Sequence, residues 1–472
     1  MNLGPRIILA ALVTVLALQP GCGKRGKPVL RAYDSQNRKL IVLSGVNTRP
    51  KHFYESADFV VVGSGLGGIA AVVTLCSQGR AVILIEETNR IAGCLIPGDT
   101  LSFAENELVE KYGASKHYRH FRDRIREWYE KRSENPPAAP PGSGGGFCCT
   151  TDVALDVIRK MLAKYQRDGA LTILLRHKVA KATLFDRRVA SVIAIDLDKK
   201  TAALVSGWAF IDASTEGDLL RGAGAKWVAG AESRAETNEP HAPGKADSLI
   251  AVDIMVCANS AAFGINVPGN RAVLDVKEAG NPPAKGVYLF GVMKEPRRIK
   301  PVTLITELDI SAEFQKGPRA RFYEDAVAIG FNPIVVRGPG GAETVVETKP
   351  FQIPLGALIT PYFDNLLAGG RNIGATRVAS GALRSPQVEW AIGEAAGLAA
   401  SFCGGEKISV HALRDNPRHL HQLHHIMVRA LSIPIYWYDD VKPDDPDFAE
   451  AQIEPFRKPE VYKKAKNLHY HK

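Results

Sequence analysis

Two uninterrupted apolar runs, with a helical segment between them, form the clearest pattern in the chain. Residues 58–62 (DFVVV) are apolar after the first position, as is typical of a strand covered on both faces. Residues 69–77 follow with the composition of a helix, and residues 81–85 form a second apolar run. This order predicts a β-α-β unit as the first strong element of the chain.

Two further segments have apolar residues at helical spacing. Residues 105–132 are rich in charge and predict one or two surface helices. Residues 136–146, rich in Pro, Gly and Ser, interrupt this pattern and predict a mobile loop of the kind that can cover an active site. Residues 152–167 then predict a helix with Thr151 or Asp152 as its N-cap.

Short apolar runs separated by charged turns follow this helix and predict a parallel strand that continues into an antiparallel meander; they span residues 171–175, 179–185, 190–197 and 202–212. Residues 225–355 contain many Gly and Pro residues and several apolar runs without a helical period, which indicates a second domain. A strand at 365–368 and a helix at 386–402 then return to the first pattern.

The glycines between the first strand and its helix point to a dinucleotide. The segment GSGLGG matches GxGxxG: Gly63 permits a tight turn, Gly65 lets backbone approach a pyrophosphate, and Gly68 lets helix and strand pack closely. Leu66 and Gly67 complete the turn. At the end of the second strand stands Glu86, where an acidic residue accepts hydrogen bonds from an adenosine ribose.

These elements predict an α/β fold, with a Rossmann-type parallel sheet, a β-meander and a second, mixed α+β domain that contributes to the substrate site. A chain of 472 residues is longer than one hydrophobic core usually organises. The expected boundaries are 1–23 for a signal peptide, 24–56 for a tether, 57–224 with 356–432 for the cofactor domain including a helical insertion at 105–147, 225–355 for the substrate or cap domain, and 433–472 for a C-terminal extension.

The composition adds little to this picture. Apolar residues make up 45% of the chain and charged residues 23%, which is an ordinary globular balance. The formal net charge is +10, but the Lys and Arg residues are scattered and form no compact basic block with interleaved aromatics. We therefore expect no nucleic-acid partner.

The N-terminus has the pattern of an export signal. Arg6 precedes an apolar run at 7–18, which is shorter than the roughly 20 residues that span a bilayer. Small or turn-forming residues follow as far as Gly23. We expect an exported protein, either periplasmic or held at the inner or outer membrane as a lipoprotein. The segment LQPGC weakly resembles a lipobox, so lipid attachment at Cys22 and simple signal cleavage both stay open.

The segments around the glycine motif resemble the FAD-dependent oxidoreductases of the glutathione-reductase-like Rossmann superfamily, over residues 58 to about 445. EETNRIAGCL matches the acidic residue and double-glycine segment after the second strand, with Ala92 replacing one glycine. FIDASTEGDLLRGAGAKW resembles the strand that re-enters the cofactor domain, and NLLAGGRNIGATRVASGALRSPQVEWAIGEAAG resembles the C-terminal flavin segment. The resemblance implies FAD as the cofactor and oxidation or reduction of an organic substrate by hydride transfer.

The resemblance also assigns residues to the cofactor. Val179 would offer backbone contacts to adenine, and the helix that starts near Pro386 would point its positive end at the flavin pyrimidine. The remaining cofactor residues implied in this way are Glu87, Gly93, Ala213, Ser214, Glu216, Gly217, Asp218, Gly370, Arg371 and Asn372. A surface salt bridge is the alternative for Arg371.

Candidates for catalysis are harder to choose, because the flavin itself accepts the hydride. Arg377, Arg384 and Glu389 flank the expected flavin segment, and His241 follows a polar stretch after the re-entry strand. Each also fits a structural role.

Cysteine and histidine spacing argues against other redox and metal chemistry. No cysteine lies a few residues from Cys94, as a flavin disulfide reductase requires, and the adjacent Cys148 and Cys149 fit two ordinary thiols better than a strained disulfide. His421 and His425 lie four residues apart without a third ligand, which fits a solvated helix face rather than a metal site.

Two other classes of function stay open at this point. Relatives in this branch are sometimes described as xanthan-lyase-like, so an exported polysaccharide lyase or hydrolase is one alternative. A non-catalytic envelope protein that binds flavin is the other. The sequence contains no second dinucleotide motif, so we expect no dedicated NADH site and an electron acceptor such as oxygen, a quinone or another protein. The substrate is expected to be a small or carbohydrate-like molecule.

Overall fold

A computed structural model describes the chain over residues 29–34, 39–44, 54–92, 100–103, 107–137, 146–247, 251–258, 287–294, 297–337, 343–437 and 440–457. The expected signal peptide with Cys22, the double-glycine position Gly93, most of the Pro-rich loop and residues 458–472 of the C-terminal extension lie outside these residues.

The centre of the molecule is a five-stranded sheet in which every neighbouring pair is parallel. Its order is β21 (Leu366–Ala368), β12 (Ala209–Asp212), β4 (Phe59–Val62), β5 (Val82–Ile85) and β8 (Leu171–Leu174). The chain goes from β4 to β5 and β8 on one side, and later strands join on the other side of β4. The order therefore reverses at β4, and such a switch point is where open α/β sheets bind ligands.

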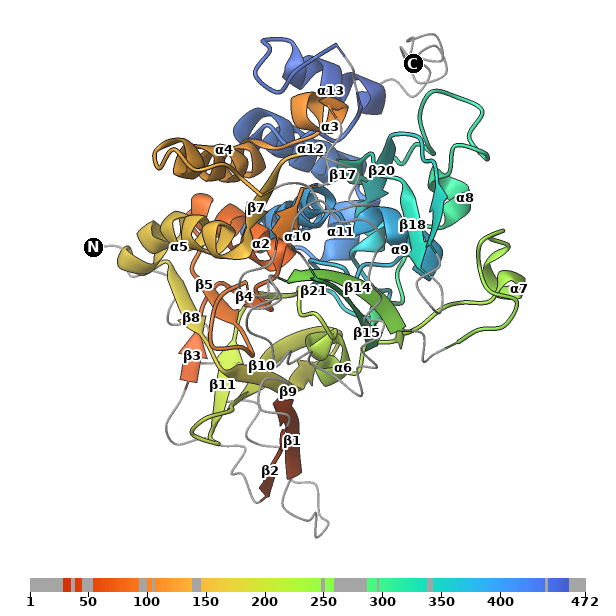
Figure 1. The fold of residues 1–472 in the computed structure, drawn as a ribbon. Helices are drawn as coiled ribbons and strands as arrows, with labels where there is room; N and C mark the ends of the chain where they lie inside the picture. Colours follow the sequence, from red (N-terminus) through yellow and green to blue (C-terminus); the bar gives the residue numbers. More distant parts are fainter. Residues whose placement is uncertain are drawn as a thin grey trace.

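Helices α2 (Leu66–Ser77), α5 (Thr151–Arg167) and α10 (Pro386–Glu406) pack beside this sheet, α2 against both of the others (Figure 1). Every residue of α2 from Leu66 to Cys76 is buried. Because α2 is covered all round, its sequence has no polar face. The N-cap of α5 is Thr150, one residue before the position we expected, and its side chain accepts a hydrogen bond from the backbone of Val153.

The predicted meander is present, but the prediction of its last strand is wrong. Residues 202–212 form two strands, β11 (Ala202–Ser206) and β12. β11 pairs with β10 (Arg188–Asp196), which pairs with β9 (His177–Phe185), whereas β12 returns to the parallel sheet. The chain changes sheet at Gly207, where a Cβ atom would lie 3.0 Å from a methyl group of Val60. The apolar run continues through this break, so its pattern could not reveal it.

The charged insertion forms α3 (Glu107–Tyr112) and α4 (Lys116–Glu130). α4 is more deeply packed than the expected surface helix, since Phe121 is fully buried and stacks on Trp390 of α10 at 5.3 Å between ring centroids. β6 (Thr100–Ser102), before the insertion, pairs antiparallel with β7 (Cys148–Thr150), after it, and β7 leads directly into α5.

Residues 225–355 contribute strand pairs and short helices, as the pattern without helical period predicted. The pairs are β13 (Trp227–Val228) with β16 (Arg298–Ile299), β14 (Ala251–Ala258) with β15 (Val287–Lys294), β17 (Ala326–Gly330) with β20 (Phe351–Pro354) and β18 (Ile334–Arg337) with β19 (Glu343–Val346); the helices are α7 (Arg234–Thr237), α8 (Glu307–Ile310) and the 3-10 turn η2 (Leu355–Ala357). The boundaries of the two domains stay a prediction.

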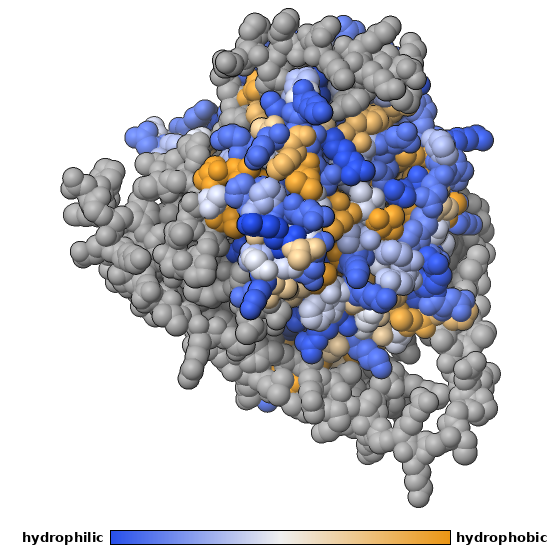
Figure 2. All heavy atoms as spheres, turned by 90° about the vertical axis from the view of Figure 1, so that its right-hand side faces the viewer, coloured by the Kyte–Doolittle hydropathy of each residue, from blue (hydrophilic) through white to orange (hydrophobic). Residues whose placement is uncertain are grey.

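The remaining elements lie at the ends of the described chain. They are β1 (Val29–Asp34), β2 (Lys39–Ser44) and β3 (Tyr54–Ser56) before the sheet, and α9 (Arg377–Leu383), α11 (Val410–Asp415), α12 (Pro417–Leu431) and α13 (Phe448–Arg457) after it. Among the described residues, no helix combines the length and apolar content needed to cross a bilayer. Figure 2 shows polar residues over much of the coloured surface on one side, with apolar patches between them.

Candidate functional site

The C-terminal ends of three neighbouring strands meet at the switch point. A Cβ atom on Gly63, after β4, would lie 2.4 Å from the backbone oxygen of Ala213, after β12. A Cβ atom on Gly67 would lie 2.1 Å from the backbone oxygen of Gly369, after β21. Neither position has room for a side chain, and Gly63 also has a positive φ of 93°. Gly370 lies beside Ala213 as well, with 3.5 Å between its Cβ position and the Ala213 Cα.

The start of α2 has the features of an anion site. Gly65 is its N-cap, with no side-chain cap and no acidic residue in the first turn. Gly68 packs on the strand as expected, since its Cβ position lies 2.0 Å from the Gly63 oxygen. Leu66 is buried, so it can contribute only its backbone to a ligand. A helix start with free N–H groups and the positive end of its dipole suits a phosphate.

Glu86 holds this turn in place. One carboxylate oxygen accepts hydrogen bonds from the backbone N of Ser64 at 2.9 Å and from its Oγ at 2.5 Å. The other oxygen accepts from the backbone N and the Oγ1 of Thr88, both at 2.8 Å. These four bonds take up the acceptor positions of a carboxylate. A role in fixing the phosphate turn is therefore visible, and the ribose contact stays a prediction.

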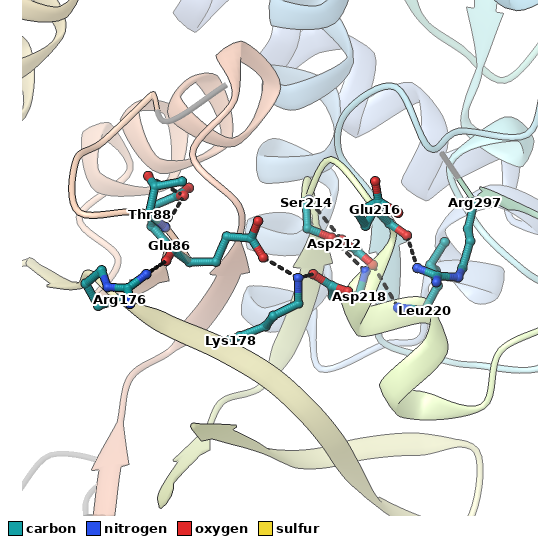
Figure 3. Close-up of polar contacts among 11 residues, drawn as sticks. Glu86, Thr88, Arg176, Lys178, Asp212, Ser214, Glu216, Asp218, Leu220 and Arg297 are labelled. Carbon is teal, nitrogen blue, oxygen red and sulfur yellow. Dashed lines mark hydrogen bonds and ion pairs between the residues drawn. The ribbon is translucent and has the colours of Figure 1, made fainter. Parts of the chain in front are cut away.

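A buried lysine joins two of the expected cofactor residues. Lys178 on β9 forms ion pairs with Glu87, which follows β5, and with Asp218 of α6 (Asp218–Ala223) at 3.1 Å (Figure 3). Burial alone would lower the pKa of Lys178, but the carboxylates of Asp218 and Glu87 raise it overall. The next residue, Val179, lies on β9, an edge strand paired only with β10 in its four-stranded sheet. An unpaired strand edge suits the backbone contact with adenine that we expect.

Asp212 organises the segment after β12. Its carboxylate, fully buried, accepts hydrogen bonds from Ser214 N at 3.0 Å, Ser214 Oγ at 2.6 Å and Leu220 N at 2.7 Å (Figure 3). Burial raises the pKa of Asp212 to about 6, although these hydrogen bonds lower it. The Oγ of Ser214 in turn accepts from Asp218 N at 2.8 Å. This side chain therefore sets the turn that carries Ala213 to Asp218.

Glu216 and Gly217 lie where this turn meets a different part of the chain. Arg297 donates a hydrogen bond to the Glu216 backbone oxygen (Figure 3). Gly217 has a φ of 62°, and its Cβ position lies 3.0 Å from the Cβ of Arg297. Burial, with the nearby Asp218 carboxylate, raises the pKa of Glu216. Arg297 therefore packs against this turn and holds its backbone by a hydrogen bond.

The segment after β21 carries the other expected cofactor residues. Asn372 is buried and donates to the Asp212 backbone oxygen at 3.0 Å, while its Oδ1 is buried without a hydrogen-bond partner among the described residues. A ribitol hydroxyl would satisfy this oxygen. Arg371 pairs with Glu389 of α10 at 2.8 Å and has a half-exposed side chain. Glu389 therefore positions Arg371, and the salt bridge that was the alternative for Arg371 is present.

Two proposed catalytic arginines lie at opposite ends of α9. Arg377 begins the helix, and its backbone N donates to Glu232 at 2.9 Å. Arg384 is the C-cap, about 10 Å further along the axis at 1.5 Å per residue. Of these two arginines, Arg377 is the one at the end of α9 that is closer in the chain to Asn372.

His241 lies in a buried acidic network beside that segment. Its Nδ1 contacts Glu307, and its backbone N donates to the same carboxylate at 3.2 Å. The backbone N of Glu307 donates to Glu239 at 2.6 Å, and Thr376 Oγ1 donates to the same Glu239 oxygen at 2.5 Å. Burial raises the pKa of Glu239, although these hydrogen bonds lower it. Thr376 is the N-cap of α9, so the network links His241 to the flavin segment.

Cysteines and histidines elsewhere form no further site among the described residues. Cys148 and Cys149 are separate buried thiols whose pKa values are raised by burial. His421 and His425 contact each other at 2.9 Å, but the described residues hold no group of three metal-ligating side chains. His424, on the same helix, is not solvated: it is buried, its Nε2 donates a hydrogen bond to the Ala326 oxygen at 2.8 Å, and burial lowers its pKa to about 3.

The fold and this site define a dinucleotide-binding flavoprotein of the Rossmann class. The model of the family described as FAD dependent oxidoreductase matches residues 58–280 and 291–426, and the chain belongs to this family. The protein is therefore an FAD-dependent oxidoreductase, and the residues at the switch point fit its cofactor.

Comparisons with individual proteins add less. No curated protein matches the chain. A geranylgeranyl bacteriochlorophyll reductase-like protein from Thermoplasma acidophilum is 12% identical over 88% of this chain and 100% of its own, with a TM-score of 0.33. The myxobacterial chondrochloren halogenase CndH is also 12% identical, over 88% of this chain and 91% of its own, with a TM-score of 0.35. These likenesses are weak, and the assignment rests on the family match.

Several residues at the site could not be found from the sequence. Lys178, Arg297, Glu239 and Glu307 lie in segments without a recognisable motif. Lys178 is placed by β9, beside Glu87 and Asp218. The positions of Arg297, Glu239 and Glu307 depend on how residues 225–355 pack beside the rest of the chain, which no local pattern encodes.

Proposed function

We propose that this oxidoreductase oxidises an organic substrate that carries a hydroxyl group, and that His241 accepts the hydroxyl proton. The observation that carries the proposal is the contact between His241 Nδ1 and the buried Glu307 carboxylate. Because Glu307 takes the Nδ1 proton as an acceptor, Nε2 is the nitrogen that can accept a proton from a substrate. A base oriented by a buried acid is a recurring arrangement for proton abstraction.

The chemistry balances with the bound cofactor. FAD, when bound, accepts the hydride from the substrate carbon and with it two electrons. The hydroxyl proton passes to His241 Nε2, and the substrate leaves as a carbonyl compound. The side chain of His241 is 33% exposed, so a substrate can reach it, whereas Glu307 is fully shielded. The family match favours this redox reaction over the polysaccharide-lyase hypothesis.

The test is anaerobic reduction of the holoprotein by sugars, polyols and other alcohols. The loss of flavin absorbance measures the reduction. His241→Gln should lower the reduction rate by about 100-fold to 10,000-fold, the usual contribution of a general base. Glu307→Gln should lower it less and shift the pH dependence. His120→Gln is the matched control, because His120 lies on the exposed side of α4. Unchanged reduction by His241→Gln with full FAD content would rule out this role.

We also propose that the protein works outside the cytoplasm, as the apolar run at 7–18 predicts. Cell fractionation with N-terminal sequencing tests this. Recovery of the chain in the cytoplasm with Met1 intact would contradict it, and palmitate labelling would separate a lipoprotein at Cys22 from a freely released form.

A further inference from the structure

Arg298 is a buried cation that is only partly paired. Its side chain is 1% exposed, and one nitrogen donates to the Gly230 oxygen at 2.6 Å and to Glu232 at 3.0 Å. The Nε and the second terminal nitrogen are shielded from solvent and have no hydrogen-bond partner among the described residues. Three of the five N–H groups of this guanidinium are therefore unsatisfied. A buried charged group in this state is costly, which indicates that a ligand with acceptor oxygens completes it.

The position of Arg298 links it to both parts of the site. The next residue, Ile299, donates its backbone N–H to the Asn372 oxygen at 2.8 Å, so β16 runs beside the flavin segment. On the other side, Glu232 binds Arg298 with one oxygen and the backbone N of Arg377 with the other. Arg377 directly follows Thr376, which contacts the His241 network through Glu239.

Further cations lie on the chain beside Arg298. Arg297 and Lys300 lie on the same segment, and the Lys300 backbone pairs with that of Lys226 at 3.0 Å. The ammonium of Lys226 lies 4.6 Å from the ring centre of Tyr362, and both lysines are exposed. Among the described residues, Glu232 is the carboxylate that pairs with the guanidinium. Clustered cations raise the local concentration of an anionic substrate.

A cofactor phosphate and a substrate carboxylate share the chemistry that Arg298 requires. The pyrophosphate has its own site at the start of α2, which has neither a side-chain cap nor an acidic residue in its first turn. Arg298 is held by the pairing of β16 with β13 and by its ion pair with Glu232. It therefore lies next to the residues that lead to His241. These contacts favour the substrate as the source of the anion.

We propose that the substrate is a hydroxy acid, with its carboxylate held by Arg298 and its hydroxyl group at His241. This inference rests on the proposed function and assigns the class of substrate at the same site.

The experiment compares hydroxy acids with neutral partners of the same carbon skeleton, such as gluconate with glucitol and glucuronate with glucose. Binding to the holoprotein is measured by calorimetry and by the change in the flavin spectrum, and anaerobic flavin reduction is measured separately. The variants are Arg298→Met, which removes the charge, and Arg298→Lys, which keeps it. Arg124→Met is the control, because Arg124 is 50% exposed and pairs with the partly exposed Glu127 on α4.

The wild type should bind the acids at least about 30-fold more tightly than the neutral partners, since losing one partner of a buried charge pair costs 2 kcal/mol or more. Arg298→Met should lose this preference with unchanged FAD content, and Arg298→Lys should recover part of it. If Arg298→Met does not fold, the test rests on the preference of the wild type for acids over neutral partners and on the change of this preference in Arg298→Lys.

Three results would overturn the inference. They are equal binding of acids and neutral partners, binding of neither, and Arg298→Met losing FAD while keeping the acid preference after reconstitution. The last result would assign the guanidinium to the cofactor. Arg298-dependent binding of acids without flavin reduction would instead support the carboxylate site and contradict the proposed oxidation.

Discussion

Gly393 in α10 lies directly against Gly67 in α2: a Cβ atom on Gly393 would lie 1.9 Å from the Gly67 backbone oxygen. The obstacle is backbone on a helix that also carries the phosphate turn, so it cannot move aside. Gly393→Ala should lower the free energy of unfolding by about 2 kcal/mol or more and reduce bound FAD. Urea denaturation and flavin absorbance measure both. Gly405→Ala on the same helix is the control, since only the flexible end of Arg80 lies near its Cβ position, at 3.2 Å. Equal stability of the two variants would contradict the prediction.

Gly65→Asp should abolish FAD binding. A carboxylate at the start of α2 would stand where the backbone approaches the pyrophosphate and would repel it. The protein should purify folded but colourless, as judged by circular dichroism and by absorbance. Gly244→Asp adds the same charge at an exposed position with no atom within 4 Å and should stay yellow. Stoichiometric FAD in Gly65→Asp would show that this turn is not the phosphate site.

Glu86→Ala should weaken FAD binding by about 10-fold to 100-fold, because hydrogen bonds to a charged group contribute about 1.5–3 kcal/mol. The carboxylate holds Ser64 in the phosphate turn, so the loss arises even without a ribose contact. Titration of apoprotein with FAD, followed by fluorescence, gives the dissociation constant. A parallel titration with FMN, which lacks the adenosine, separates the roles: loss for FAD alone would support the ribose contact, and loss for both would support the turn. Unchanged FAD affinity would exclude both roles.

Asp212 should make stability depend on pH. Its pKa is raised by burial from 3.8 to about 6, so the folded protein binds this proton more tightly than the unfolded chain. The stability of the wild type relative to Asp212→Asn should therefore be greatest below about pH 4 and fall by up to about 3 kcal/mol as the pH rises to 6. Urea denaturation of both proteins at several pH values measures the difference. A constant difference, or one that grows with pH, would contradict the raised pKa.

Local pattern predicted the cofactor half of the molecule well. The sequence predicts the glycine turn, the strands beside it and the helices α2 and α10 to within a few residues. It can do so because the glycine motif and the apolar runs there are each compatible with only one kind of local structure. Gly63 and Gly68 meet the close contacts for which small residues were expected. The family match agrees with the resemblance that the flavin segment suggested.

The substrate half was predicted less well, and for physical reasons. His241 was recognised as a candidate, but its partner Glu307 lies 66 positions away and no spacing rule joins them. Glu389 is expected near the flavin as a catalytic group, but it pairs with Arg371, for which the sequence predicts a salt bridge only as an alternative and without a partner. The partly paired Arg298 could not be recognised at all, since an arginine in a polar segment is normally solvated.

The phosphate turn, the Asp212 segment and the strand end at Gly369 come from three distant parts of the chain, yet their backbones lie in direct contact. A nascent chain therefore cannot form the FAD site until the middle of α10 has been synthesised, because the contacts of Gly393 and Gly397 with α2 are missing before then. Truncated chains will lack the cofactor's stabilising effect and its colour. Bound flavin thus reports on complete synthesis and correct assembly of the whole cofactor domain, and colour can serve as a measure of both in expression trials.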